Sequence, residues 1–174
     1  SDKDTHPYIG AISFHSWRGC DDATLKVWAD ASKKLNVPLL VGEGSTDAAA
    51  WRYPQIFKES TFALYEINLY MRLCSICQPQ SILQWQLTAD YSLLWGGGIF
   101  GVKGDLVPTQ RFWNLKQLAS TPEGSFALPV TCKKSTLNCA AFANIACNKY
   151  CVHMVNNGAA CATTIEGLPT QFKN

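Results

Sequence analysis

The sequence predicts an α/β fold in which about three parallel βα units, forming part of a (β/α)8 barrel, are followed by a small antiparallel β unit. Between residues 8 and 118, short apolar segments alternate with segments of helix length. This alternation is typical of parallel strands joined by crossover helices. After residue 122, short β-like runs follow one another with turn signals between them. We therefore divide the chain into residues 1–122 and 123–174.

The strongest strand signal is the continuously apolar segment 37–41, which ends in Gly42-Glu43-Gly44. Such a short, β-rich run predicts a strand that is buried on both faces. An acid at the carboxyl end of such a strand lies where barrel enzymes place their chemistry. Glu43 is therefore a candidate catalytic residue. The alternative is a turn with a solvated acid.

Other elements of the first region follow from periodicity and end signals. We expect strands at 9–16 and 81–87 and helices at about 55–76 and 109–119. A further helix lies between the first two strands. Its cap candidates are Asp21, Asp22 and Thr24, and its left-handed stop is Asn36.

Three parallel strands with helices on one side form an incomplete sheet with adhesive edges. A complete (β/α)8 barrel takes roughly 250 residues, so this region has the size of three of its units. The second region has β-like runs at 126–132, 137–144, 150–156 and 163–168. They predict part of a β-sandwich.

Composition excludes several classes of protein. The chain has 174 residues, 47% of them hydrophobic and 16% charged, as expected of a globular protein with a substantial core. The formal net charge of +2 comes without a long basic run, which argues against nucleic-acid binding. The sequence contains no apolar run long enough to span a membrane and no charged-then-apolar leader after Ser1. We interpret the chain as processed, trimmed or part of something longer.

Eight cysteines are present, and five of them lie at or beyond residue 132. If the protein is exported, this clustering predicts at least one disulfide there, with Cα atoms roughly 4.4–6.8 Å apart. Free thiols that act as small hydrophobes are the alternative. Cys74-x-x-Cys77 has no second pair with matching spacing, so we expect neither a metal nor a cofactor.

The ends of the three predicted strands bring chemically useful side chains to one edge of the sheet. A carboxylate and a histidine beside exposed indoles suit a sugar, because indoles stack on pyranose faces and polar groups bind the hydroxyls. Taken singly, His15 is more often structural and Trp85 is more often core. The candidate substrate-binding residues are His15, Trp17, Trp51, Trp85 and Trp95.

The sequence lacks the motifs of a nucleotide-binding site and of a serine hydrolase. Gly42-x-Gly44 follows a strand, but the third position of a dinucleotide fingerprint is Asp47 and not glycine. The glycine run 96–98 lacks the following Lys-Ser/Thr of a phosphate loop. A Gly-x-Ser-x-Gly nucleophile elbow is also absent from the sequence.

Three short motifs carry a family resemblance: Phe-His-Ser-Trp at 14–17, Leu-Leu-Val-Gly-Glu-Gly at 39–44 and Leu-Gln-Trp-Gln at 83–86. They resemble strands six, seven and eight of the clan A glycoside hydrolases, which are retaining (β/α)8-barrel enzymes of the cellulase-like superfamily. Segments 152–158 and 164–169 resemble strands of the small β-sandwich that follows the barrel in the family 30 type.

The resemblance implies roles for individual residues. Glu43 would be the nucleophile, His15 would contact the substrate or the nucleophile, and Trp85 would form the floor of the subsite for the cleaved sugar. The general acid/base of this clan is the Glu of an Asn-Glu pair, and this sequence contains no such pair. Retaining hydrolysis needs two carboxyl groups about 5–5.5 Å apart, so the resemblance implies a C-terminal piece that is inactive alone.

The resemblance therefore predicts hydrolysis of a β-linked polysaccharide or oligosaccharide by a longer parent protein. That parent would be secreted, periplasmic or on the cell surface, and no obligate protein partner is implied. A non-catalytic carbohydrate-binding or scaffold protein using the same aromatic edge is the alternative. A self-contained small α/β protein is the third possibility.

Overall fold

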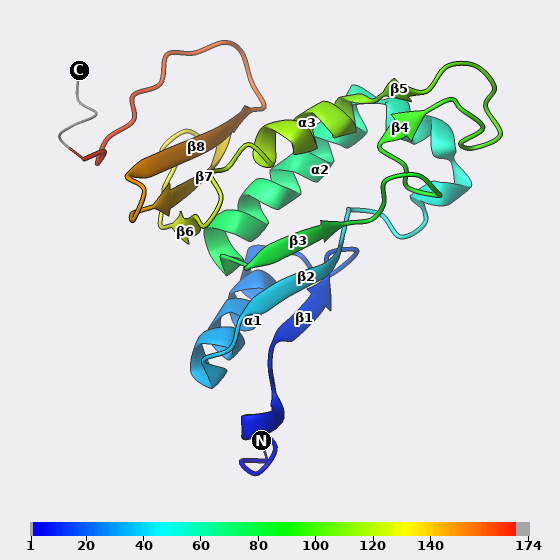
Figure 1. Ribbon diagram of the computed structural model, residues 1–174. Helices are drawn as coiled ribbons and strands as arrows, with labels where there is room; N and C mark the ends of the chain where they lie inside the picture. The colour runs from blue at the N-terminus through cyan, green and yellow to red at the C-terminus, as the bar shows by residue number, and fades with distance from the viewer. Residues whose placement is uncertain (1, 170–174) are drawn as a thin grey trace.

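The computed structural model describes residues 2–169 as a mixed α/β protein with one parallel and two antiparallel sheets (Figure 1). Its helices are α1 (Asp22–Leu35), α2 (Ser60–Arg72) and α3 (Gln110–Leu118). Its strands are β1 (Ile12–His15), β2 (Leu39–Gly44), β3 (Ser81–Gln84), β4 (Leu94–Trp95), β5 (Val107–Pro108), β6 (Phe126–Leu128), β7 (Leu137–Asn144) and β8 (Lys149–Asn156).

The parallel sheet has the strand order β1–β2–β3. Helix α1 connects β1 to β2, and α2 lies in the connection from β2 to β3. This arrangement confirms the predicted α/β class with three parallel strands. All three strands therefore end at one edge of the sheet, which is where His15, Glu43 and Trp85 lie.

Helix α1 begins and ends at the residues that the sequence predicts. The Asp21 carboxylate caps it by accepting hydrogen bonds from the Thr24 backbone N–H at 3.0 Å and the Thr24 hydroxyl at 2.8 Å. Asn36 ends it in the left-handed region with φ of 53°. Leu25 and Ala29 of this helix are buried against the sheet.

The helix predicted at 55–76 is interrupted in the structure. A 3-10 turn at Pro54–Lys58 comes first, Glu59 is extended, α2 follows, and a π-helical turn at Leu73–Cys77 ends the segment. The physical reason is tertiary packing. Phe57 is fully buried edge-on against Phe62, at 5.4 Å between ring centroids, and this contact fixes the 3-10 turn apart from the helix that follows.

The main core lies between the helices and one face of the parallel sheet. Phe14 on this face stacks on Trp28 of α1, with ring centroids 5.2 Å apart, and Val41 is fully buried. On the opposite face Ser13 is exposed and Leu83 is 56% exposed. Within residues 2–169, the outer edges of β1 and β3 have no partner strand.

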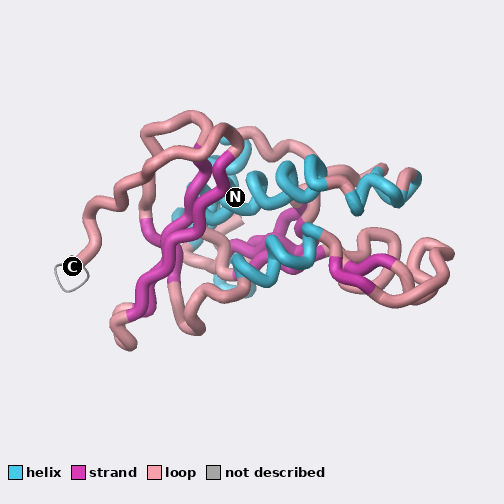
Figure 2. Tube along the Cα trace, turned by 90° about the horizontal axis from the view of Figure 1, so that it is seen from above, coloured by secondary structure: helices cyan, strands magenta, loops and turns pink. Residues whose placement is uncertain are grey.

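Strands β6, β7 and β8 form an antiparallel sheet in sequence order. Figure 2 shows the long β7–β8 hairpin at one end of the helices and the β4–β5 ladder at the other. The hairpin confirms the predicted strands at 137–144 and 150–156, whereas the run at 126–132 is a strand only over β6. The predicted strand at 163–168 is wrong, because that segment runs exposed and without a ladder partner.

One sheet face of this β unit packs against the first region. Ala140, Phe142 and Val155 join the main core, and the Asn138 side-chain amide donates to the side-chain oxygen Oδ1 of Asn68 in α2 at 2.6 Å. The division of the chain near residue 122 stays a prediction.

A disulfide joins Cys132 to Cys139, with Cα atoms 6.6 Å apart. This confirms the prediction of at least one close pair in the C-terminal part. Cys74 and Cys77 are free and buried, and burial raises the pKa of each thiol to about 12. These two behave as small hydrophobes of the core.

Candidate functional site

The carboxylate of Glu43 lies at the carboxyl edge of the parallel sheet, in contact with His15 of β1 and with Trp17 just after that strand. His15 Nδ1 is 3.2 Å from Glu43 Oε2, and the Trp17 indole Nε1–H donates to the same oxygen at 2.8 Å. The side chains remain accessible, with 52% of His15 and 27% of Glu43 exposed. Because both residues contact Oε2, the other oxygen, Oε1, can be offered to an electrophile.

A bulge in β2 gives Glu43 this direction. In register, Phe14 pairs with Val41 and His15 with Glu43, so β2 has one more residue than β1 over this step. The same extra residue appears against β3, where Val41 pairs with Ile82 and Gly44 pairs with Gln84. Three steps along β2 therefore match two steps along β3. In a regular strand residue 43 would face the helices, as Val41 does. The bulge turns it toward the His15 side of the sheet.

Both glycines beside Glu43 have close neighbours. A Cβ on Gly42 would lie 2.6 Å from Ser13 Oγ and 3.6 Å from the His15 ring. A Cβ on Gly44 would lie 2.7 Å from Ile82 Cγ2 and 3.0 Å from the Tyr70 hydroxyl. Side chains of β1, β3 and α2 therefore pack closely against the backbone of the Gly-Glu-Gly motif.

We expect Gly44→Ala to lower the free energy of unfolding by about 1–3 kcal/mol, because the added methyl overpacks a buried site. Gly10→Ala is the matched control, since a Cβ there meets no heavy atom within 4 Å. Urea denaturation of both variants, followed by circular dichroism, measures the difference. Equal midpoints for the two would contradict the tight packing described at Gly44.

The other candidate tryptophans differ in how much of each side chain is exposed. Trp85 follows β3 directly, donates its backbone N–H to the Gly44 carbonyl at 2.9 Å and is 39% exposed. Trp51 is 50% exposed on the 3-10 turn Ala50–Arg52 after β2. Trp95, in contrast, is only 8% exposed, and its ring packs against Phe100 and Lys58 at 5.2 and 5.1 Å.

The structure thus brings His15, Trp17 and Glu43 into contact and sets Trp85 on the neighbouring strand end. Trp51 lies on the loop after β2, and Trp95 lies buried on β4, beyond the parallel sheet. Trp95 therefore offers no free ring face to a sugar in this arrangement.

A buried ion pair beneath the site was missed by the sequence reasoning. The Arg111 guanidinium of α3 makes two hydrogen bonds to the Glu66 carboxylate of α2, at 3.1 and 2.8 Å, and their side chains are 0% and 3% exposed. A signal was available, because Glu66 interrupts the apolar face of its helix between Ala63 and Ile67. A carboxylate at such a position requires a buried cationic partner.

Tyr70 also supports the edge of the sheet. Its hydroxyl donates to the Gln84 amide oxygen at the end of β3, and the Gln84 amide donates to the Trp85 carbonyl at 2.9 Å. Burial and the Glu66 charge raise the pKa of Tyr70 well above its usual 10. Tyr70 is therefore a neutral hydrogen-bond donor that holds the strand end before Trp85.

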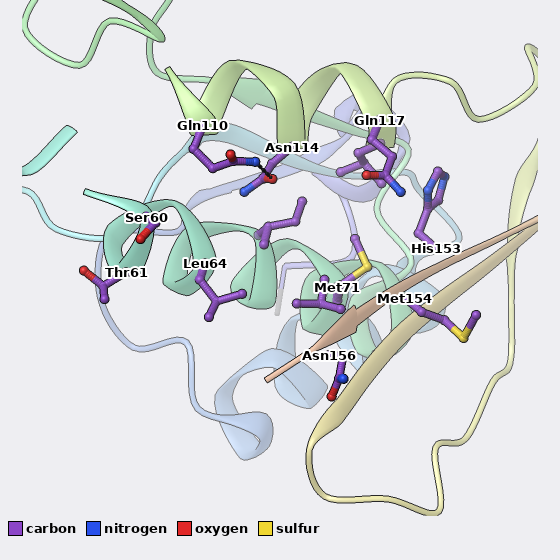
Figure 3. Close-up of a pocket in the computed structure, with 13 residues that line it drawn as sticks. Ser60, Thr61, Leu64, Met71, Gln110, Asn114, Gln117, His153, Met154 and Asn156 are labelled. Carbon is purple, nitrogen blue, oxygen red and sulfur yellow. Dashed lines mark hydrogen bonds between the residues drawn. The ribbon is translucent and has the colours of Figure 1, made fainter. Parts of the chain in front are cut away.

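A pocket of about 400 Å³ lies elsewhere, between α2, α3 and β8 (Figure 3). Its lining combines an apolar floor with neutral polar groups, including Ser60, Asn114 and Gln117. Its titratable residue is His153, whose pKa burial lowers below its usual value, and the His153 Nε2 lies 2.8 Å from the Thr121 hydroxyl. The pocket lacks a carboxylate among its lining residues, so we place the candidate chemistry at Glu43.

The chain matches no protein-family model and no curated protein. Within residues 2–169, no group of three or more histidine, cysteine or acidic side chains is arranged to hold a metal ion. The helices of this described part are all too short or too polar to cross a membrane. The contacts of Glu43 are the feature of this chain that bears on its function.

Proposed function

We propose that Glu43 is the nucleophile of a retaining β-glycoside hydrolase and that this chain supplies three βα units of its (β/α)8 barrel, followed by part of a β-sandwich. The observation that carries the proposal is the shared contact of His15 and Trp17 with Glu43 Oε2. A carboxylate that is oriented by an indole donor and a neighbouring histidine, at the carboxyl edge of a parallel sheet, is what a positioned nucleophile requires.

The open edges of the sheet support the barrel part of the proposal. Within the described residues β1 and β3 each lack an outer neighbour, and Leu83 is exposed on the face away from the helices. In a closed barrel further strands would pair with both edges, and this face would become the packed interior.

The proposed reaction is a double displacement. Glu43 attacks the anomeric carbon of a β-linked sugar, the bond from that carbon to the leaving oxygen breaks, and a glycosyl ester forms on the carboxylate. Water then cleaves the ester and returns Glu43 to its ionised form. The second carboxyl group, which protonates the leaving oxygen and deprotonates the water, would come from a strand outside this chain.

The aromatic residues provide the proposed sugar contacts. Trp85 lies next to Glu43 along the strand ends and would form the floor of the subsite for the cleaved sugar. Trp51 is exposed on the turn after β2 and would contact a neighbouring sugar unit. The disulfide between Cys132 and Cys139 supports export of the parent protein, because disulfides persist in oxidising compartments.

The reading frame upstream of the codon for Ser1 tests the proposal. We expect it to encode five further βα units and an Asn-Glu pair at the end of one strand. The isolated chain is expected to release no sugar from aryl β-glycosides, since general-acid help alone contributes about 10²–10⁴-fold. A start codon directly before Ser1, or turnover by the isolated chain that Glu43→Gln removes, would contradict the proposal of a partial barrel.

The exposure of Trp51 and Trp85 also favours a second candidate, a non-catalytic carbohydrate-binding protein. The two candidates differ in what Glu43→Gln changes in the complete protein. An enzyme loses turnover and keeps sugar binding, whereas a binding protein has no turnover to lose. Isothermal titration with oligosaccharides, run beside a reducing-sugar assay, distinguishes them.

A further inference from the structure

We propose that Glu43 is held in position by a closed ring of mostly buried contacts, the positioning ring, and not by its own strand alone. The members of the ring are Ser16, Trp17, Ser45, Glu66, Tyr91 and Arg111. The catalytic role of Glu43 rests on the proposed function, whereas the ring itself rests on contacts within this chain. Apart from Trp17, its members act through other residues and are positioning residues.

The first part of the ring joins the ends of β1 and β2. The Ser16 hydroxyl donates to the Ser45 carbonyl at 2.7 Å and accepts from the Ser45 backbone N–H at 3.0 Å. The Ser16 backbone N–H donates to the Glu43 carbonyl at 3.0 Å. Ser16 and Ser45 are 1% and 0% exposed. The Ser16 side chain thus joins the two chain segments by hydrogen bonds just beyond the bulge, in place of regular strand pairing.

The second part connects this clamp to the helices. The Ser45 hydroxyl donates to Glu66 Oε2 at 2.7 Å, and the Arg111 guanidinium donates to the same carboxylate through Nε and Nη2. A buried carboxylate that accepts three hydrogen bonds has little freedom to move. The position of Ser45 is therefore fixed by α2 and α3 as well as by the sheet.

The last part returns to the site. Arg111 Nη1 donates to the carbonyls of Tyr91 and Ser92, both at 3.0 Å. The Tyr91 ring packs on the Trp17 indole with centroids 4.9 Å apart, and its hydroxyl donates to the Asp47 carbonyl at 2.6 Å. Because Trp17 follows Ser16 directly in the chain, the ring closes on the donor that contacts Glu43.

Such a ring is needed because Glu43 lies on a bulge. At a bulge the regular ladder is disrupted, so strand pairing alone does not fix the direction of the side chain. A reacting group displaced by about 1 Å can lose about 10²-fold in rate. Rigid buried neighbours supply the missing constraint.

The Trp17 indole N–H reports the position of Glu43 without any need for activity. In the 174-residue chain with ¹⁵N-labelled tryptophan, six indole signals are expected, and Trp17→Phe assigns the one that belongs to Trp17. Glu43→Ala gives the signal and the hydrogen-exchange rate of the broken contact. We expect Ser45→Ala to move the Trp17 signal toward that reference and to accelerate its exchange about tenfold, as expected when a charge-assisted hydrogen bond is lost.

Ser32→Ala is the matched control, because it also removes one serine side-chain hydrogen bond, in this case a partly buried one to the Val37 carbonyl at 2.6 Å, at the far end of α1. It is expected to leave the Trp17 signal unchanged. If Ser45→Ala does not fold, the double variant Glu66→Leu/Arg111→Met serves instead, since replacing a buried ion pair by apolar residues is often neutral for stability.

A folded Ser45→Ala chain, or a folded double variant, with the wild-type Trp17 signal and exchange rate would overturn the positioning ring. This result would leave the proposed chemistry of Glu43 untouched. Conversely, a protein without glycosidase activity could still show the ring through the Trp17 signal. The two proposals can therefore fail separately.

Discussion

Arg111→Ala is expected to lower the free energy of unfolding by about 3–5 kcal/mol, because it leaves the Glu66 carboxylate buried and unpaired. Arg111 is fully buried, and its guanidinium also donates to two backbone carbonyls and lies 4.7 Å from the centre of the Phe57 ring. Since small domains are stable by about 5–15 kcal/mol in total, this loss is a large fraction of the whole. Urea denaturation followed by circular dichroism measures it.

The double variant Glu66→Leu/Arg111→Met is the control for this prediction. It removes both charges together and fills the space with apolar atoms, so we expect it to recover most of the lost stability. An Arg111→Ala midpoint equal to that of the wild type would show that the pair is not buried as described. A double variant as unstable as Arg111→Ala would show that the ion pair itself stabilises the fold.

The second large effect is on catalysis. In the complete parent protein, Glu43→Gln is expected to lower kcat by at least about 10⁴-fold, as removal of a nucleophile does in other covalent mechanisms. Substrate binding should be retained, because the amide has the shape of the carboxylate and its oxygen can still accept from Trp17 Nε1. Initial rates on aryl β-glycosides, together with titration of an unreacted oligosaccharide, separate the two quantities.

Glu123→Gln provides the control for charge removal, since Glu123 is an exposed residue that precedes β6. Its kcat should equal that of the wild type. A Glu43→Gln parent with normal kcat would remove Glu43 from the mechanism. A variant that has lost sugar binding along with turnover would show that Glu43 binds the ground state and does more than react.

The parallel sheet could be predicted because each of its signals is local. The apolar segment that ends at Glu43 forms β2, and the cap at Asp21 and the stop at Asn36 bound α1 as expected. The placement of His15 and Glu43 at neighbouring strand ends follows once the strands are parallel and adjacent. These features need only periodicity, end signals and the geometry of a parallel sheet.

What could not be predicted depends on contacts between distant residues. Strand alternation alone would turn Glu43 toward the helices, and the bulge that reverses it is visible only in the register with both neighbours. Glu66 and Arg111 are separated by 45 residues, so their pairing appears only when α2 and α3 pack. The helix predicted at 55–76 is longer than the observed one for the same reason, because the burial of Phe57 interrupts it.

The most direct measurement is to trap the reacting group. The complete parent protein is incubated with 2-deoxy-2-fluoro β-glycosides that carry a good leaving group, and the digested protein is analysed by mass spectrometry. If Glu43 is the nucleophile, the peptide that spans residues 35–52 gains the mass of one fluoroglycosyl group, and fragmentation places it on Glu43. A glycosyl group on another carboxylate, in a protein that is inactivated by the reagent, would contradict the assignment of Glu43.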